Sequence, residues 1–206
     1  MKQLVAQLQN VLWHRHMTMD ELVEVLQVWV KEYHAKVTTT TTEELELGAI
    51  TVHGMCDLHI EQDSCELELG LITHPDTVSV LFDTKTTKSF VFEFVQVLQH
   101  ELIHASQYEK RDWEESGIES CGYYDHPDEI DAHAHDIALE LHHAHLPLTI
   151  LKKASTIKKE DSMTLWAYYQ EFPWTHPVIQ ALLKKVVKYY KSNQCCLLYT
   201  SPSPRD

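Results

Sequence analysis

The residues best suited to chemistry are two histidines and a glutamate in the stretch QHELIHASQY, residues 99–108. His100 and His104 are four residues apart, so on a helix they lie on one face, one turn from each other. Both imidazoles can then bind the same metal ion, and Glu101 can take a proton from a water molecule without binding the metal. This H-E-x-x-H pattern is typical of zinc-dependent hydrolases. The alternative is an ordinary buried helix whose histidines make hydrogen bonds.

The residues around this pattern are almost all apolar. The stretch SFVFEFVQVLQHELIHASQY, residues 89–108, has no polar face and therefore predicts a buried helix. Burying two imidazoles and a carboxylate costs on the order of several kcal/mol unless something satisfies them. A bound metal ion would do so, which favours the metal-site interpretation.

A catalytic zinc ion needs a third protein ligand and an open position for water. The best source is YYDHPDEIDAHAHDIA, residues 123–138, in which a helix is expected from about Asp128 onward. Glu129 and His133 are four residues apart and lie along one flank of its apolar stripe. We predict Glu129 as the third ligand, with His133 or Asp136 supporting a ligand. The alternative ligands are His133, His126 and Asp131, and the flank could also be an acidic, solvated surface.

Two further groups are candidates for roles in the site. Tyr123 and Tyr124 precede the second helix, and one of them could donate a hydrogen bond to the oxyanion of a hydrolytic intermediate. We take Tyr124 as that candidate, the alternative being that its ring packs on the helix. The HHAH stretch, residues 142–145, is a candidate second metal site, but it falls at a helix end, where histidine also suits the helix dipole.

Taken together, HELIHASQY and YYDHPDEIDAHAHDIA resemble the small gluzincin-type zinc metallopeptidases, including short phage-encoded and bacterial proteins whose second motif reads roughly Y-x-x-x-P-x-E-I-x-A. The resemblance implies one zinc ion per chain on His100, His104 and Glu129, with Glu101 as the general base. It also implies a peptide or protein substrate that lies extended along an edge strand, for which CELELGLITH or TVSVLFD would serve. The histidines of DAHAHD depart from the family pattern and leave a histidine ligand open.

These motifs predict a metalloendopeptidase-like enzyme. The alternative is a catalytically silent metal-binding protein, structural or regulatory and of phage origin. A further alternative is a regulator that cleaves one specific partner, and the last is a helical protein that binds no metal.

Composition excludes some partners. The formal net charge of −14, from 31 acidic and 17 basic residues, repels phosphate backbones and argues against a general nucleic-acid binder. No apolar run approaches the roughly 18 residues of a membrane span, and the N-terminus is amphipathic rather than signal-like. We therefore expect a cytoplasmic protein. The five cysteines form no C-x-x-C pair, which favours free thiols.

The hydrophobic periodicity predicts an α+β fold. Helical spacing covers residues 2–13 and 18–36, where Thr18 and Glu21 form a capping-box pattern. Alternation within residues 45–83 predicts three strands, the first two forming a hairpin, and the run TTTTTEE before them is either a linker or the start of a strand. One or two further helices are expected over residues 160–193, broken at FPWTHP. The small sheet would pack on the buried active-site helix and on a second, ligand-bearing helix, as in a minimal zincin-like domain.

The expected organisation has four parts. Residues 1–37 form N-terminal helices, residues 38–146 the zincin-like core, residues 147–195 a C-terminal helical extension, and residues 196–206 a non-native tail. This tail, CLLYTSPSPRD, resembles a translated sequencing adapter, which implies a metagenomic source and excludes these residues from reasoning about the fold.

Overall fold

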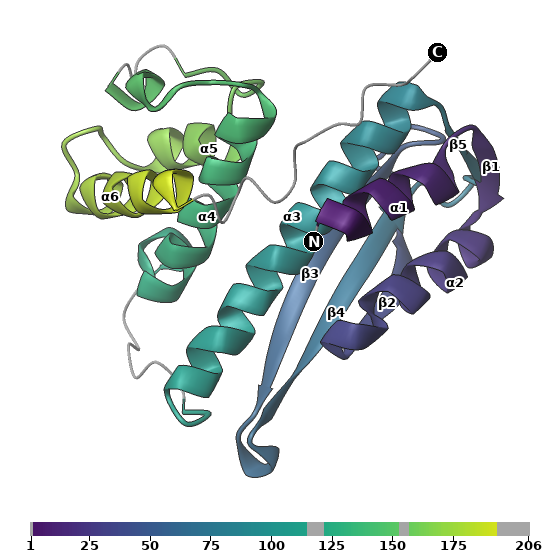
Figure 1. Cartoon of the computed structure of the whole chain (residues 1–206), viewed down its shortest axis with the longest axis horizontal. Coiled ribbons are helices and arrows are strands. Elements are labelled where there is room, and N and C mark those ends of the chain that lie inside the picture. The colour runs from purple at the N-terminus through teal and green to yellow at the C-terminus, as the bar shows by residue number, and fades with distance from the viewer. Residues whose placement is uncertain (1, 115–121, 153–156, 193–206) are drawn as a thin grey trace. The chain divides into compact units, whose positions relative to one another are not determined.

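The computed structural model describes residues 2–114, 122–152 and 157–192 and has the α+β fold predicted from the sequence (Figure 1). The chain forms two compact units. We call Gln3–Glu115 the N-terminal unit, and the C-terminal unit consists mainly of Ser116–Asp206. The N-terminal unit combines helices with two small sheets, whereas the described elements of the C-terminal unit are all helical.

The elements of the N-terminal unit follow one another in this order: α1 (Lys2–Leu12), β1 (Arg15–Thr18), α2 (Met19–Val30), the short 3-10 helix η1 (Lys31–Tyr33), β2 (Ala35–Thr41), β3 (Ile50–His59), η2 (Ile60–Gln62), β4 (Ser64–Thr73), β5 (Ser79–Phe82) and α3 (Thr84–Lys110). The predicted capping box at the start of α2 is confirmed. Thr18 N donates to Glu21 Oε2 at 2.9 Å, and Glu21 N donates to Thr18 Oγ1 at 3.3 Å.

The main sheet has three strands in the order β2-β4-β3, with β2 parallel and β3 antiparallel to β4. The predicted hairpin, β3–β4, is confirmed. The third strand of this sheet is β2, because the β-branched threonines of AKVTTTT favour extended backbone. The third strand predicted from the sequence, β5, pairs instead with β1 in a separate two-stranded sheet.

This topology corrects one expectation about the substrate strand. The stretch CELELGLITH lies in β4, which is hydrogen-bonded to β2 on one side and to β3 on the other. Since both sides of β4 are already paired, β4 cannot accept another strand. The edges of the three-stranded sheet are β2 and β3.

The hydrophobic core of this unit lies between the sheet and the helices. Side chains alternate along the strands, so that Leu67, Leu69 and Leu71 of β4 are buried on the face that packs against α3. Figure 1 shows α3 running along the β3–β4 hairpin. Each fully buried leucine or phenylalanine contributes roughly 1.5–3 kcal/mol to stability. The core residues supplied by the helices are Leu8, Leu12, Leu22, Leu26, Val30, Phe90, Val91, Phe94, Val95 and Leu98.

Helix side chains bind the backbone at both edges of the sheet. At the β2 edge, Gln27 Nε2 donates to Ala35 O at 2.9 Å, and Val37 N donates to Gln27 Oε1 at 2.9 Å. At the β3 edge, Val52 N donates to Glu93 Oε1 at 2.8 Å. Burial raises the pKa of Glu93, although the Val52 N–H opposes this rise. The helices are therefore tied to the sheet by hydrogen bonds as well as by apolar packing.

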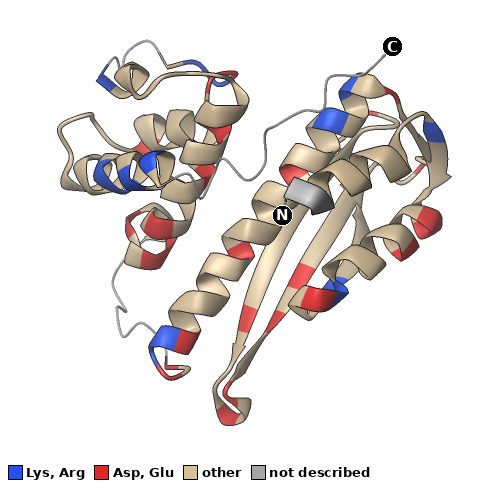
Figure 2. Ribbon diagram, viewed as in Figure 1, with Lys and Arg blue, Asp and Glu red and all other residues tan. Residues whose placement is uncertain are grey.

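The elements of the C-terminal unit are η3 (Tyr123–Asp125), α4 (Pro127–His143), η4 (Leu148–Lys152), α5 (Met163–Glu171) and α6 (Pro177–Lys191). The break predicted at FPWTHP is confirmed, since it separates α5 from α6. Helix α4 packs against α5 and α6. Figure 2 shows acidic residues on α4 and basic residues on α6, and Asp131 accepts hydrogen bonds from Lys185 Nζ and from Tyr189 OH. Charge complementarity thus supports the α4–α6 packing.

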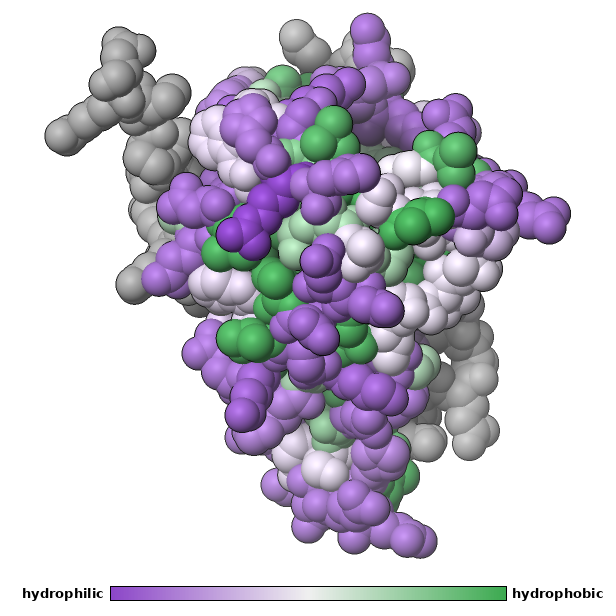
Figure 3. Space-filling model, turned by 90° about the vertical axis from the view of Figure 1, so that its right-hand side faces the viewer, coloured by the Kyte–Doolittle hydropathy of each residue, from purple (hydrophilic) through white to green (hydrophobic). Residues whose placement is uncertain are grey.

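The described surface offers no membrane-spanning element. Among residues 2–114, 122–152 and 157–192, no helix has both the length and the apolarity needed to cross a bilayer. On the face shown in Figure 3, hydrophobic residues lie between hydrophilic ones. Cys56 and Cys65 are free thiols. The adapter-like tail at residues 196–206 lies outside the described residues, as do the other three cysteines.

Candidate metal centre

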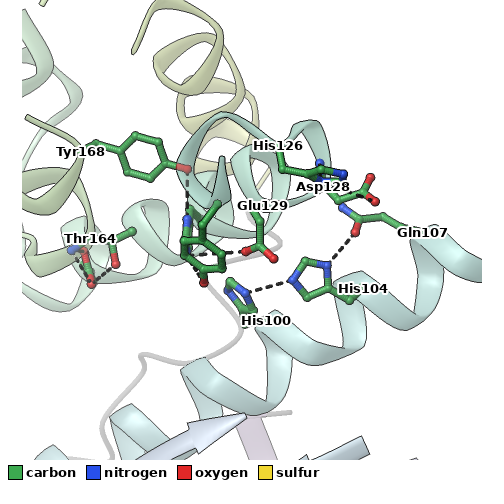
Figure 4. A network of polar contacts seen from close by, with 11 residues as sticks. His100, His104, Gln107, His126, Asp128, Glu129, Thr164 and Tyr168 are labelled. Carbon is green, nitrogen blue, oxygen red and sulfur yellow. Dashed lines mark hydrogen bonds and ion pairs between the residues drawn. The ribbon is translucent and has the colours of Figure 1, made fainter. Parts of the chain in front are cut away.

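The H-E-x-x-H motif lies in the second half of α3, within the predicted helix. The Nε2 atoms of His100 and His104 face each other at 3.1 Å, and their ring centroids are 4.8 Å apart (Figure 4). His104 Nδ1 is 2.9 Å from Gln107 Oε1. Because the amide oxygen of Gln107 can only accept, this contact is a hydrogen bond when His104 carries a proton on Nδ1, and in the neutral ring that tautomer directs the lone pair of Nε2 toward His100.

The spacing of these two nitrogens fits a shared metal ion. Zinc binds histidine nitrogen at about 2.0–2.1 Å, so two nitrogens on one tetrahedral zinc ion are roughly 3.3 Å apart. The observed separation between His100 Nε2 and His104 Nε2 is 3.1 Å. A ligating histidine usually donates its other ring N–H to an oxygen, and Gln107 supplies this oxygen for His104. The two imidazoles on α3 are therefore spaced so that they could share one metal ion, and equally so that one could donate a hydrogen bond to the other.

Glu101, between the two histidines, is buried, with only 6% of its surface exposed. Its side chain lies against Gly54 of β3. The thiol of Cys56, in the same strand, has a raised pKa. Burial is the largest cause, the hydrogen bond with Cys65 is the next, and the negative charge of Glu101 makes a smaller contribution in the same direction. The predicted general base is therefore held between α3 and the edge strand β3.

In the C-terminal unit, α4 brings Glu129 and His133 onto one flank, as their spacing predicts. His133 Nε2 is 3.9 Å from Glu129 Oε2 and 3.3 Å from the hydroxyl of Tyr123. His133 Nδ1 is 3.0 Å from the hydroxyl of Tyr168, a residue of α5 that is fully buried. Burial raises the pKa of Tyr168, so its hydroxyl keeps its proton. The imidazole of His133 is thus held on both sides by tyrosine hydroxyls.

Tyr168 is the residue of this cluster that the sequence did not reveal. It lies 35 residues after His133, in a helix whose sequence, MTLWAYYQE, carries no chemical motif. Tyr124, the predicted oxyanion donor, packs its ring edge-on against Tyr168, with centroids 5.0 Å apart. The hydroxyl that contacts His133 within η3 belongs instead to Tyr123. The catalytic role of Tyr124 stays a prediction.

Several other candidates from the sequence have structural contacts of their own. His126 is the N-cap of α4, where its Nδ1 accepts from Asp128 N at 3.3 Å. Asp131 binds Lys185, and the ring of His142 from the HHAH stretch stacks on Tyr190 with centroids 3.9 Å apart. His126 thus caps α4, and Asp131 and His142 contact α6, while the role of these three residues in a metal site stays a prediction.

His100 of the N-terminal unit and the Glu129–His133 pair of the C-terminal unit each offer ligand atoms that could hold a metal ion. The geometry within each unit is compatible with ligation. The complete ligand set, including the choice between Glu129 and His133, stays a prediction.

Comparison with known proteins identified no matching family model, no matching curated protein and no matching solved structure. The likeness to gluzincin-type metallopeptidases therefore depends on the two sequence motifs.

Proposed function

We propose that this protein is a zinc-dependent hydrolase of peptide bonds, with one zinc ion held by His100, His104 and Glu129. The observation that carries the proposal is the pair of facing imidazole nitrogens on α3, 3.1 Å apart, with Glu101 between them in the sequence. Two neutral imidazoles and a carboxylate are the ligands of a familiar class of catalytic zinc sites.

Each residue has a distinct task in this proposal. Zinc, when bound, supplies a Lewis acid and lowers the pKa of water. Glu101 accepts a proton from the attacking water and then delivers it to the amine of the departing peptide. Gln107 keeps the imidazole of His104 oriented through the 2.9 Å hydrogen bond. Tyr124 is the proposed donor to the oxyanion that develops on the substrate carbonyl.

Elemental mass spectrometry of untagged protein tests the metal assignment. We expect about one zinc ion per chain in the wild type, and loss of that zinc in His100→Ala and in Glu129→Ala. The matched control is His53→Ala, which removes an exposed histidine from β3 and should leave the zinc content unchanged. Full zinc content in His100→Ala would refute the site.

Hydrolysis tests the chemistry separately from metal binding. Glu101→Gln keeps the size of the side chain but removes the base, so it should retain zinc and lose on the order of 10²–10⁴-fold in the rate of peptide cleavage. A library of unstructured peptides, read by mass spectrometry, provides the substrates. Cleavage that persists at the wild-type rate in Glu101→Gln would rule out its proposed role.

A metal-binding protein without catalysis is the second candidate, and the environment of His133 favours it. This imidazole is oriented by Tyr168 in the way that supporting residues orient metal-binding histidines. If His133 joined the other three ligands, four protein ligands would fill a tetrahedral ion and leave no position for water. Stoichiometric zinc without any peptide cleavage, together with loss of affinity in both Glu129→Ala and His133→Ala, would establish this candidate.

A further inference from the structure

Gly54, in the middle of the edge strand β3, lies against the side chain of Glu101. A Cβ atom at position 54 would be 2.5 Å from Cγ and 2.7 Å from Cδ of Glu101, and closest of all to Oε1. Real Cβ atoms essentially never lie within 3.0 Å of a heavy atom from outside their own residue and its chain neighbours. Any side chain at position 54 would therefore displace the carboxylate of Glu101.

The surroundings of Gly54 are otherwise those of a packed strand. Its partner across the hairpin is Leu69, which is fully buried, and Val52 on the same face of β3 is buried as well. Glycine inside a strand lowers stability because it packs nothing and leaves the unfolded chain more freedom. A glycine in such a position therefore marks a close approach by another group, and here that group is Glu101.

We infer that Gly54 is a positioning residue for Glu101. The missing side chain leaves the space in which the Glu101 carboxylate lies, and Glu101 fills it while remaining 6% exposed. The inference rests on the proposed function, in which Glu101 is the general base. A general base must lie within about 2.6–3.2 Å of the group whose proton it takes, and a misplacement of about 1 Å can cost on the order of 100-fold in rate.

Gly54→Ala separates positioning from a purely structural role. The atoms that meet the new methyl group belong to a side chain, so Glu101 can swing aside while β3 keeps its pairing. Gly70→Ala, in β4, is the matched control. Its Cβ would be 2.8 Å from Cδ2 and Cε1 of His53, an exposed side chain that can move into solvent. Both variants add one methyl group to the same hairpin, but only the first displaces Glu101.

The first measurement compares kcat and KM of each variant with those of the wild type. We expect Gly54→Ala to keep its zinc, to keep KM within about threefold of the wild type and to lose on the order of 100-fold in kcat. Gly70→Ala should keep both constants within about threefold. A Gly54→Ala protein that retains kcat within about threefold would overturn the inference.

The second measurement does not need catalysis. Gly54→Ala should lower the melting temperature in the wild-type background, but not in a Glu101→Ala background, where the obstructing atoms are gone. Equal shifts in both backgrounds would overturn the inference. A wild-type protein that binds zinc but cleaves no peptide would refute the proposed function and the positioning role together, and unequal shifts would then establish only the contact between Gly54 and Glu101.

Discussion

Removal of the Tyr168 hydroxyl gives the sharpest test of the packing around His133. Tyr168 is fully buried, and its hydroxyl is 3.0 Å from His133 Nδ1. In Tyr168→Phe the ring keeps its shape and its packing, but Nδ1 of His133 loses this partner. His133 is 8% exposed, so water cannot readily replace the lost hydroxyl.

The expected cost follows from this burial. Leaving a buried polar group without its partner destabilises a protein by about 1–3 kcal/mol, and the loss of one oxygen atom from a packed ring adds little. We therefore expect Tyr168→Phe to lower the free energy of unfolding by about 1–3 kcal/mol. Urea unfolding followed by circular dichroism measures this change, with the unfolding of the two units fitted as separate transitions. We expect a lower urea concentration at the midpoint and an unchanged slope of the unfolding free energy against urea concentration.

The neighbouring Tyr169 is the matched control. Its hydroxyl is buried too, but among the described residues it has no hydrogen-bond partner, and burial raises its pKa. Tyr169→Phe should therefore leave the free energy of unfolding unchanged or raise it slightly, because an unsatisfied polar group is removed. Equal effects of the two substitutions would refute the reasoning.

Three further predictions concern the N-terminal unit. Burial raises the pKa of Glu93 above its ordinary 4.5, so the folded state binds this proton more tightly than the unfolded state and stability falls as the pH rises through the raised value. Glu93→Gln should flatten that fall in urea titrations above pH 4.5, and the exposed Glu43→Gln should not. Thr18→Ala removes the cap of α2 and should cost about 0.5–2 kcal/mol of stability, measured by thermal unfolding, whereas Thr18→Ser should cost less. Burial raises the pKa of Cys56, so iodoacetamide should alkylate it more slowly in the folded than in the unfolded protein, as read by peptide mass spectrometry; equal rates would contradict this.

The sequence predicts local features of this protein well because they depend on neighbours in the chain. The four-residue spacing of His100 and His104 requires only a helix to bring their nitrogens together, and α3 supplies it. The start of α3 was missed by five residues, since Asp83 caps the helix by accepting from Thr86 N at 2.7 Å. That cap lies before the apolar run from which the helix was predicted.

Features that depend on distant residues were not predictable in the same way. Strand β1 has four residues, too few for a period, and it exists because it pairs with β5 more than 60 residues later. The parallel pairing of β2 with β4 is equally non-local, so alternation could not choose between β2 and β5 as the third strand. In the candidate site, the contact between Tyr168 and His133 joins α5 to α4, and no pattern in either segment indicates it.

The side chains at the sheet edges affect how readily the protein aggregates at high concentration. A strand with unpaired N–H and C=O groups is a template on which other chains can aggregate. At the β2 edge, Gln27 occupies the N–H of Val37 and the C=O of Ala35, as a neighbouring strand would. At the β3 edge, Glu93 occupies the N–H of Val52 and places a carboxylate where an incoming strand would have to lie. Gln27 and Glu93 thus occupy part of each outer edge, which leaves fewer backbone groups free to pair with another chain, and the same two residues tie the helices to the sheet.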